Sequence, residues 1–236
     1  MAPNADRHAL PLHVQISEML IRDIQAGRLL DGERLPPERA MAEGLGISVG
    51  TLRKALADLT EKGMLERVQG SGNYVRANID VKSVYAFFRV ELLDGGGLPT
   101  AELLSVDRVP KDPGLPAFGA APDGFRIRRL RSLSGRPAVL EEIWLDGSYA
   151  QTIAPRDLRE SLYLYYRQSL GLWITRAEDR LGMALVPDWA PDGFGPRPGA
   201  PAVMATRISW AQDGARAEVS RNWIDSDIAT YVARIT

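Results

Sequence analysis

Arg129 and Arg131 are the first residues whose type and spacing suggest chemistry. They lie two positions apart in the alternating segment 125–133, FRIRRLRSL. Side chains two apart on a strand share a face, and two guanidinium groups on one face need a bound anion or acidic neighbours. A carboxylate or phosphate ligand is one interpretation. The alternative is pairing with carboxylates of the chain itself, which would be Glu141, Glu142 or Asp107. We expect Arg126 and Arg128, which alternate with the pair, to be solvated.

A second group of residues lies at the start of a predicted helix over 48–62, SVGTLRKALADLTEK. Arg53 lies opposite the apolar stripe of this helix and therefore points outward. An outward arginine near the start of a helix can bind guanine through O6 and N7. Ser48 and Gly50 are small enough for close approach to nucleic acid. The candidate DNA-contact residues here are Ser48, Val49, Gly50, Thr51 and Arg53.

The elements needed to position these residues can be read from the periodicity. Residues 11–27 and 36–44 predict two helices before 48–62, and Arg39 in the second could reach a phosphate or a base edge. Two short strands, MLERV and NYVRA, then flank the turn QGSG, which predicts a hairpin. Three helices followed by a hairpin is the order of a winged helix-turn-helix. The hairpin tip, formed by Gly70, Ser71 and Gly72, could lie over the minor groove, with Arg67 and Arg76 beside it.

Bulk composition limits the function classes. The 236-residue chain has a net charge of −1, and residues 1–76 contain ten Lys or Arg and ten Asp or Glu, so DNA binding depends on where charges lie. There are no cysteines, and the only histidines are His8 and His13. We therefore expect no metal site and no cofactor. We also expect no signal peptide and no membrane span, which fits a cytoplasmic protein.

Residues 84–236 have a different pattern, with strands broken by turn signals. The strand-like segments are YAFFRVELL, AELLSVDRV, FRIRRLRSL, AVLEEIWL and AVMATRISW. Helical patterns occur near 148–170 and near 111–119, and the Pro- and Gly-rich stretch 188–201 predicts a loop. Runs of strands without βαβ alternation predict an α+β fold with an antiparallel sheet. The expected division is a DNA-binding domain at 1–76, a linker at 77–83 and a second domain at 84–236.

Residues 11–76 resemble the DNA-binding domain of GntR-family regulators. The elements that carry the resemblance occur in order: LPPER at 35–39, LGIS at 45–48, TLRKAL at 51–56 and QGSG at 69–72. By resemblance, the family's DNA-contact positions correspond to Arg39, Ser48, Thr51, Arg53, Gln69 and Gly70. Two residues depart from the family pattern. Pro37 replaces a common serine, and Val49 replaces an arginine that contacts DNA in many members, so a thymine methyl is a possible contact instead.

Residues 84–236 resemble the HutC-type effector domain, also called UTRA, which is related in fold to chorismate lyase. The stretches that carry the resemblance are AELLSVDRVP, FRIRRLRSLSGRPAVLEEIWL, SLYLYYRQSLG and GAPAVMATRISWAQDGARAEVSRNWIDSD. The resemblance implies an effector pocket made by Arg129, Arg131, Glu141, Ser161, Tyr163 and Glu218. Ile224 replaces a common tyrosine, and loop 188–201 could reshape the pocket entrance.

These observations lead to the expectation of a ligand-responsive transcription regulator and not an enzyme. Its partners would be a palindromic double-stranded DNA operator, a small anionic metabolite and a second copy of the chain in a homodimer that represses transcription. Two alternatives remain at this point. The second domain could be a chorismate-lyase-like enzyme fused to a DNA-binding module, or the chain could recruit a protein partner without sensing a metabolite.

Overall fold

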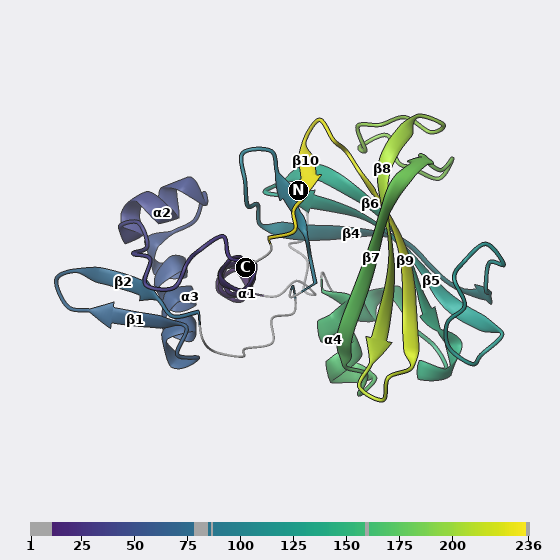
Figure 1. Ribbon diagram of the computed structural model, residues 1–236, viewed down its shortest axis with the longest axis horizontal. Helices are drawn as coiled ribbons and strands as arrows, with labels where there is room; N and C mark the ends of the chain where they lie inside the picture. The colour runs from purple at the N-terminus through teal and green to yellow at the C-terminus, as the bar shows by residue number, and fades with distance from the viewer. Residues whose placement is uncertain (1–10, 78–84, 86, 159–160, 235–236) are drawn as a thin grey trace, which may run out of the picture. The chain divides into compact units, whose positions relative to one another are not determined.

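The computed structural model describes residues 11–77, 85, 87–158 and 161–234 (Figure 1). These residues divide into two units, with Leu10–Arg89 forming most of the first and Val90–Val232 most of the second. Apart from Ala77, the linker expected at 77–83 lies outside the described residues. No helix in the described ranges has the length and apolar character needed to cross a membrane.

Three helices make up most of the first unit: α1 (Leu12–Gln25), α2 (Glu38–Gly44) and α3 (Val49–Glu61). Ser48 directly precedes α3 and is its N-cap, because its hydroxyl accepts a hydrogen bond from the Thr51 backbone N–H at 3.0 Å. The predicted apolar stripe is buried and consists of Leu52, Ala55, Leu56 and Leu59. All three helices occur where the sequence periodicity predicts them.

A hairpin completes the first unit. The strands β1 (Leu65–Val68) and β2 (Gly72–Val75) are antiparallel, and Leu65 lies opposite Val75. The segment before α2 runs along β2 as well, because Leu35 donates its N–H to the Asn73 carbonyl at 2.9 Å. The hairpin is therefore the predicted wing, and the segment that leads into α2 is held beside it.

The second unit is built on a six-stranded antiparallel sheet with the order β4-β5-β6-β9-β8-β7. The strands are β4 (Pro99–Pro110), β5 (Asp123–Leu133), β6 (Arg136–Asp146), β7 (Ile174–Leu185), β8 (Pro201–Ala211) and β9 (Arg216–Ile224). A short ladder pairs β3 (Val90–Leu92) with β10 (Ala229–Tyr231). The α+β class and the antiparallel sheet are confirmed.

Helices are fewer in this unit than the pattern predicts. The region near 148–170 contains two short 3-10 turns, Gly147–Tyr149 and Pro155–Asp157, and the helix α4 (Leu162–Ser169). No helix forms at 111–119, where Pro113, Gly114 and Pro116 interrupt the backbone pattern. The strand predicted from residue 85 covers only Val90–Leu92, because β10 supplies just three partners. The prediction of a loop over 188–201 is correct except for its last residue, which begins β8.

The two faces of the sheet differ in what covers them. On one face, α4 lies over Ser209 and Glu218, to which its Tyr163 hydroxyl is bonded. On the other face, the segment 186–200 packs through Val186 and Phe194 against Leu130, Leu140 and Trp223. Arg129 and Arg131 belong to the α4 face. Arg129 lies opposite Glu141, and Glu141 lies opposite Asn222. Asn222 is four residues from Glu218 on the same strand, so this row shares its face with Glu218. Loop 188–201 therefore packs on the face opposite this pair, contrary to the suggestion that it reshapes their pocket.

Candidate DNA-binding surface and effector site

The first turn of α3 presents the small polar residues of the predicted DNA surface. Ser48 is exposed, and its hydroxyl shares a hydrogen bond of 2.8 Å with that of Thr51. Val49 is half-buried. Gly50 is exposed, and a Cβ built there would meet only the Ser48 hydroxyl, at 3.8 Å. The fold itself therefore does not require glycine at position 50.

Arg53 lies one turn further along and has 66% of its side chain exposed. Its Nε donates to Oε2 of Glu38, the first residue of α2, at 2.6 Å. Glu38 therefore connects α2 with α3. Because the bond uses Nε, it does not involve the two terminal nitrogens of Arg53.

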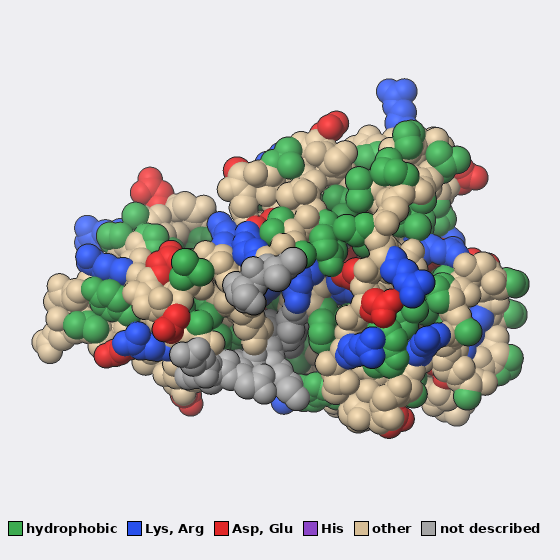
Figure 2. Space-filling model, in the orientation of Figure 1, with side chains coloured by type: hydrophobic (Ala, Val, Ile, Leu, Met, Phe, Trp, Pro, Cys, Tyr) green, Lys and Arg blue, Asp and Glu red, His purple; other side chains and the backbone are tan. Residues whose placement is uncertain are grey.

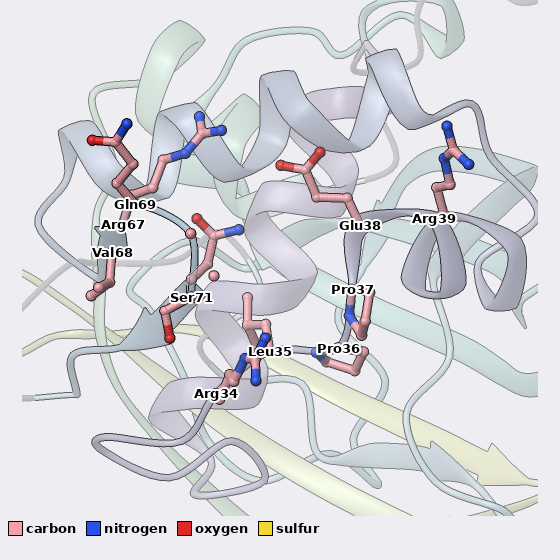
Figure 3. Close-up of a pocket in the computed structure, with 13 residues that line it drawn as sticks. Arg34, Leu35, Pro36, Pro37, Glu38, Arg39, Arg67, Val68, Gln69 and Ser71 are labelled. Carbon is pink, nitrogen blue, oxygen red and sulfur yellow. The ribbon is translucent and has the colours of Figure 1, made fainter.

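A groove of about 800 Å³ lies between the segment 34–39 and the wing (Figure 3). Arg39 lies at the α2 side of the groove, and Arg67 and Gln69 lie at the wing side. The predicted DNA residues among its lining are Arg39, Gln69, Gly70 and Ser71. The backbone of Gly70 has φ +76°, which glycine adopts at little cost and which closes the hairpin.

Arg34 also lines this groove and is a cation that the sequence analysis did not single out. Its guanidinium nitrogen lies only 3.2 Å from where a Cβ on Gly72 would be, so a side chain at position 72 would displace it. The bridge between Arg34 and Tyr74 places it beside β2, a pairing across 40 residues that no local pattern predicts. By contrast, Arg76 is paired with Glu66 on the neighbouring strand.

The predicted effector residues meet on the α4 face of the sheet. Arg129 and Arg131 are both buried and share one carboxylate, that of Glu141: Arg129 Nη2 lies 2.6 Å from Oε2, and Arg131 Nε lies 2.7 Å from Oε1. Burial opposes ionisation of Glu141, but the charges and hydrogen bonds of both arginines outweigh it and lower its pKa to about 2. Two cations and one anion leave this cluster with a net positive charge.

Glu218 lies in a second group, formed with hydroxyl-bearing residues on the same face. Its carboxylate accepts hydrogen bonds from Tyr166 at 2.8 Å, Tyr163 at 3.1 Å and Ser209 at 3.1 Å. Burial outweighs these bonds and raises the pKa of Glu218 above its ordinary value. Ser161 is also buried and acts as the N-cap of α4, since its hydroxyl accepts from the Leu164 N–H at 3.3 Å.

Tyr166 connects the two groups and was not predicted. It is fully buried, is bonded to Glu218, and lies close enough to Arg129 to affect the pKa of that guanidinium. Its signal in the sequence is the spacing of three from Tyr163, which places both rings on one face of a helix. The structure therefore brings Arg129, Arg131, Glu141, Tyr163 and Glu218 to one face, with Tyr166 beside them.

Charges of both signs are interspersed on the face of the molecule seen in Figure 2. Within the described ranges, no group of three or more acidic or histidine side chains is placed to hold a metal ion. The α4 face instead carries buried arginines beside hydroxyl groups.

Comparison with known families places both units. Residues 12–75 match the family described as bacterial regulatory proteins, gntR family, and residues 94–230 match the UTRA domain. The chain belongs to the GntR family of transcriptional regulators. It has the HutC-type architecture, in which a GntR winged helix-turn-helix precedes a UTRA domain. This assignment identifies a DNA-binding transcription regulator and not an enzyme.

Relatives of known type include three regulators. The chain is 60% identical to SmoD of Agrobacterium fabrum, an HTH-type transcriptional regulator, over 96% of this chain and 97% of SmoD. It is 25% identical to the HTH-type transcriptional repressor NagR of Bacillus subtilis, over 94% of each. It is 29% identical to MngR of Escherichia coli, the mannosyl-D-glycerate transport/metabolism system repressor, over 72% of this chain and 73% of MngR.

Two solved structures share the fold. The possible transcriptional regulator YydK of Bacillus subtilis superposes with a TM-score of 0.52 at 20% identity, covering 96% of this chain and all of YydK. The ligand-binding domain of a putative GntR-family regulator from Bordetella bronchiseptica gives 0.54 at 22% identity, covering 64% of this chain and 98% of that domain. These similarities support the α+β fold derived above.

Proposed function

We propose that this GntR-family regulator is a transcriptional repressor that a small anionic metabolite controls. Residues 1–76 bind the DNA operator and residues 84–236 bind the effector. The names of NagR and MngR, both repressors, support the direction of regulation. A homodimer with twofold symmetry would place two winged helices on a palindromic operator.

The observation that carries the sensing proposal is the buried Arg129–Glu141–Arg131 cluster. A buried cluster with a net positive charge is a costly arrangement in a low-dielectric interior. An anionic ligand would neutralise the excess charge and accept hydrogen bonds from guanidinium groups. Ser161, Tyr163 and Glu218 on the same face would supply the remaining polar contacts, of the kind that recognise hydroxyl groups of a metabolite.

A thermal-shift screen of anionic metabolites tests this site. A ligand that binds only the folded chain raises its melting temperature in proportion to RT ln(1 + [L]/Kd). We expect at least one anion to stabilise the wild-type chain. The same anion should not stabilise the Arg131→Ala variant. If no anion stabilises the chain, or if the variant responds equally, the effector site is not this cluster.

The DNA half of the proposal assigns the operator contacts to Arg39, Ser48, Val49, Gly50, Thr51, Arg53, Gln69, Gly70 and Ser71. Arg53 is the proposed base reader, because Glu38 fixes its Nε and leaves its outer nitrogens for a guanine. Arg53→Ala should weaken binding to DNA selected from a random pool by about 1–3 kcal/mol, with little effect on scrambled DNA.

Arg76→Ala is the matched control for Arg53→Ala. Arg76 is also an arginine with an acidic partner, Glu66, but it follows β2 of the wing instead of lying on α3. If Arg76 contacts DNA at all, it contacts a phosphate, so its loss should change the affinity for selected and scrambled DNA alike. Fluorescence anisotropy on both DNAs separates the two roles, and equal behaviour of the two variants would contradict the assignment of Arg53.

A further inference from the structure

The face of the sheet opposite α4 carries a second polar groove, of about 420 Å³. Its floor contains Arg126 and Arg128 of β5, Glu142 of β6 and Arg221 of β9. Adjacent strand residues point to opposite faces, so Arg128 lies on the other side of the sheet from Arg129. The groove is thus separated by the sheet from the Arg129–Glu141–Arg131 cluster and forms no part of it.

Tryptophans and arginines alternate in this groove. Trp144, Trp189 and Trp223 line it, with the guanidinium of Arg128 4.5 Å from the ring centre of Trp189 and that of Arg126 5.8 Å from that of Trp144. The arginines that the sequence suggested were solvated are therefore packed against aromatic rings. Aromatic walls with a few charged groups are typical of small-molecule sites.

The walls of the groove are held in place by contacts elsewhere in the unit. On one side, Trp189 belongs to the loop whose Val186 and Phe194 are buried against the sheet. On the other side, Arg221 bonds Asp112 at 3.1 Å and the Gly114 carbonyl at 2.9 Å. The walls of the groove are therefore held by contacts within the second unit itself.

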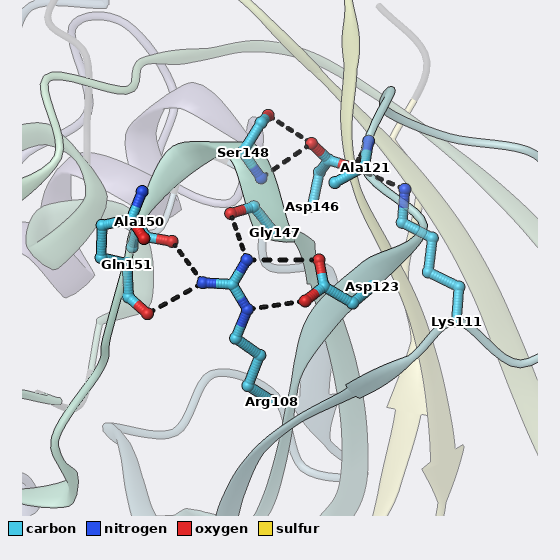
Figure 4. Close-up of polar contacts among 9 residues, drawn as sticks. All are labelled: Arg108, Lys111, Ala121, Asp123, Asp146, Gly147, Ser148, Ala150 and Gln151. Atoms are coloured by element: carbon cyan, nitrogen blue, oxygen red, sulfur yellow. Dashed lines mark hydrogen bonds and ion pairs between the residues drawn. The ribbon is translucent and has the colours of Figure 1, made fainter.

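Asp146, which is fully buried, anchors the segment that carries Asp112 and Gly114 (Figure 4). It pairs with Lys111 and accepts from the Ala121 N–H at 3.1 Å, while Lys111 also donates to the Phe118 carbonyl at 2.7 Å. Both ends of the segment are thus tied to the end of β6.

The carboxylates of the groove already have donors. Glu142 accepts from Arg128 at 2.9 Å and from the Trp144 indole at 3.2 Å, and Asp112 accepts from Arg221 and from the Gly114 N–H. Two buried donors, in contrast, have no acceptor among the residues that the structure describes. They are Nε of Arg126 and Nε1 of Trp223, and Trp223 is only 5% exposed.

Unsatisfied buried donors are rare and each needs an explanation, and an acceptor that enters the groove would supply one. We propose that this groove is a second binding site, for a small organic carboxylate. An ionised carboxylate only accepts hydrogen bonds, so it matches a site whose unmatched groups are donors. The tryptophan walls favour a ligand with an organic body over a bare inorganic ion, because they offer apolar surface to cover.

The indole signals of the five tryptophans in the full-length chain provide the test. Protein labelled with ¹⁵N-tryptophan is titrated with benzoate, gluconate and inorganic phosphate in separate experiments at constant ionic strength, and Trp223→Phe assigns the Trp223 signal. We expect an organic carboxylate to shift that signal, with an affinity about tenfold or more above that of phosphate.

Two variants decide where the ligand binds. Arg126→Lys keeps the positive charge but loses the Nε donor of a partly exposed side chain, and should weaken the carboxylate about tenfold or more. Arg131→Gln, on the α4 face, should leave the titration unchanged even if the proposed effector site fails.

Four results would overturn the second site. The first is that neither carboxylate shifts the Trp223 signal, and the second is that phosphate binds as tightly as either carboxylate. The third is that Arg131→Gln loses the response, and the fourth is that the signal depends on protein concentration instead of ligand concentration. The last result would mean that a second copy of the chain covers the groove.

Discussion

Glu141→Gln tests whether the buried arginine cluster is organised by one carboxylate. The side chain of Glu141 is 7% exposed and is paired with two arginines whose side chains are 5% and 6% exposed. Its pKa falls from 4.5 to about 2, which at about 1.4 kcal/mol per unit corresponds to about 3 kcal/mol of stabilisation at neutral pH. Breaking a buried pair by removing one partner costs a similar amount, about 3–5 kcal/mol.

We therefore expect Glu141→Gln to lower the free energy of unfolding by about 3 kcal/mol in urea titrations at pH 7. The chain contains a matched control in Glu178, which also interacts with two arginines, Arg176 and Arg180. The side chain of Glu178 is 38% exposed, and those of its partners are 65% and 75% exposed. Glu178→Gln should cost less than about 1 kcal/mol, because solvent screens the exposed pairs.

The pH dependence of the unfolding free energy tests the same prediction in a second way. A carboxylate whose pKa is lower in the folded than in the unfolded chain stabilises the fold at pH values above its pKa in the unfolded chain. This stabilisation is lost as the pH falls through its pKa in the folded chain. The difference between the wild type and Glu141→Gln should therefore shrink as the pH falls from about 4.5 toward about 2. A cost equal to that of Glu178→Gln, or a difference independent of pH, would refute the reasoning.

Two further predictions concern a helix cap and a tyrosine. Ser48→Ala removes the N-cap of α3 and should lower the free energy of unfolding by about 1 kcal/mol, measured in urea, and also weaken binding to selected DNA; unchanged stability would contradict the cap. Tyr166→Phe removes the shortest hydrogen bond to Glu218 and should cost about 1–3 kcal/mol at neutral pH. Because Glu218 has a raised pKa, protonation at acidic pH should relieve this cost, and a loss that grows with acid would contradict it.

The winged helix is predictable from sequence because its signals are local. A serine cap, an apolar stripe at helical spacing and a glycine turn between two short strands each specify an element within a few residues. The pairing of Glu38 with Arg53 is not local, since 15 residues separate them.

The second unit was harder to predict for the same physical reason. The strand β7 lies at the sheet edge with mostly exposed or half-buried residues, so it lacks the alternation that marks a half-buried strand. Arg126 and Arg128 looked solvated because nothing nearby in sequence covers them. Their environment comes from Trp189, about 60 residues later in the chain, which only the fold brings to β5.

Operator binding with and without effector tests the central claim most directly. The affinity of the full-length chain for DNA selected from a random pool is measured by anisotropy, in the presence of phosphate monoesters and organic carboxylates in turn. We predict that at least one of these anions changes the operator affinity of the wild type by about 5- to 150-fold, and that Arg131→Gln abolishes the change. No change with any anion, or the same change in the variant, would contradict control of DNA binding through the Arg129–Glu141–Arg131 cluster.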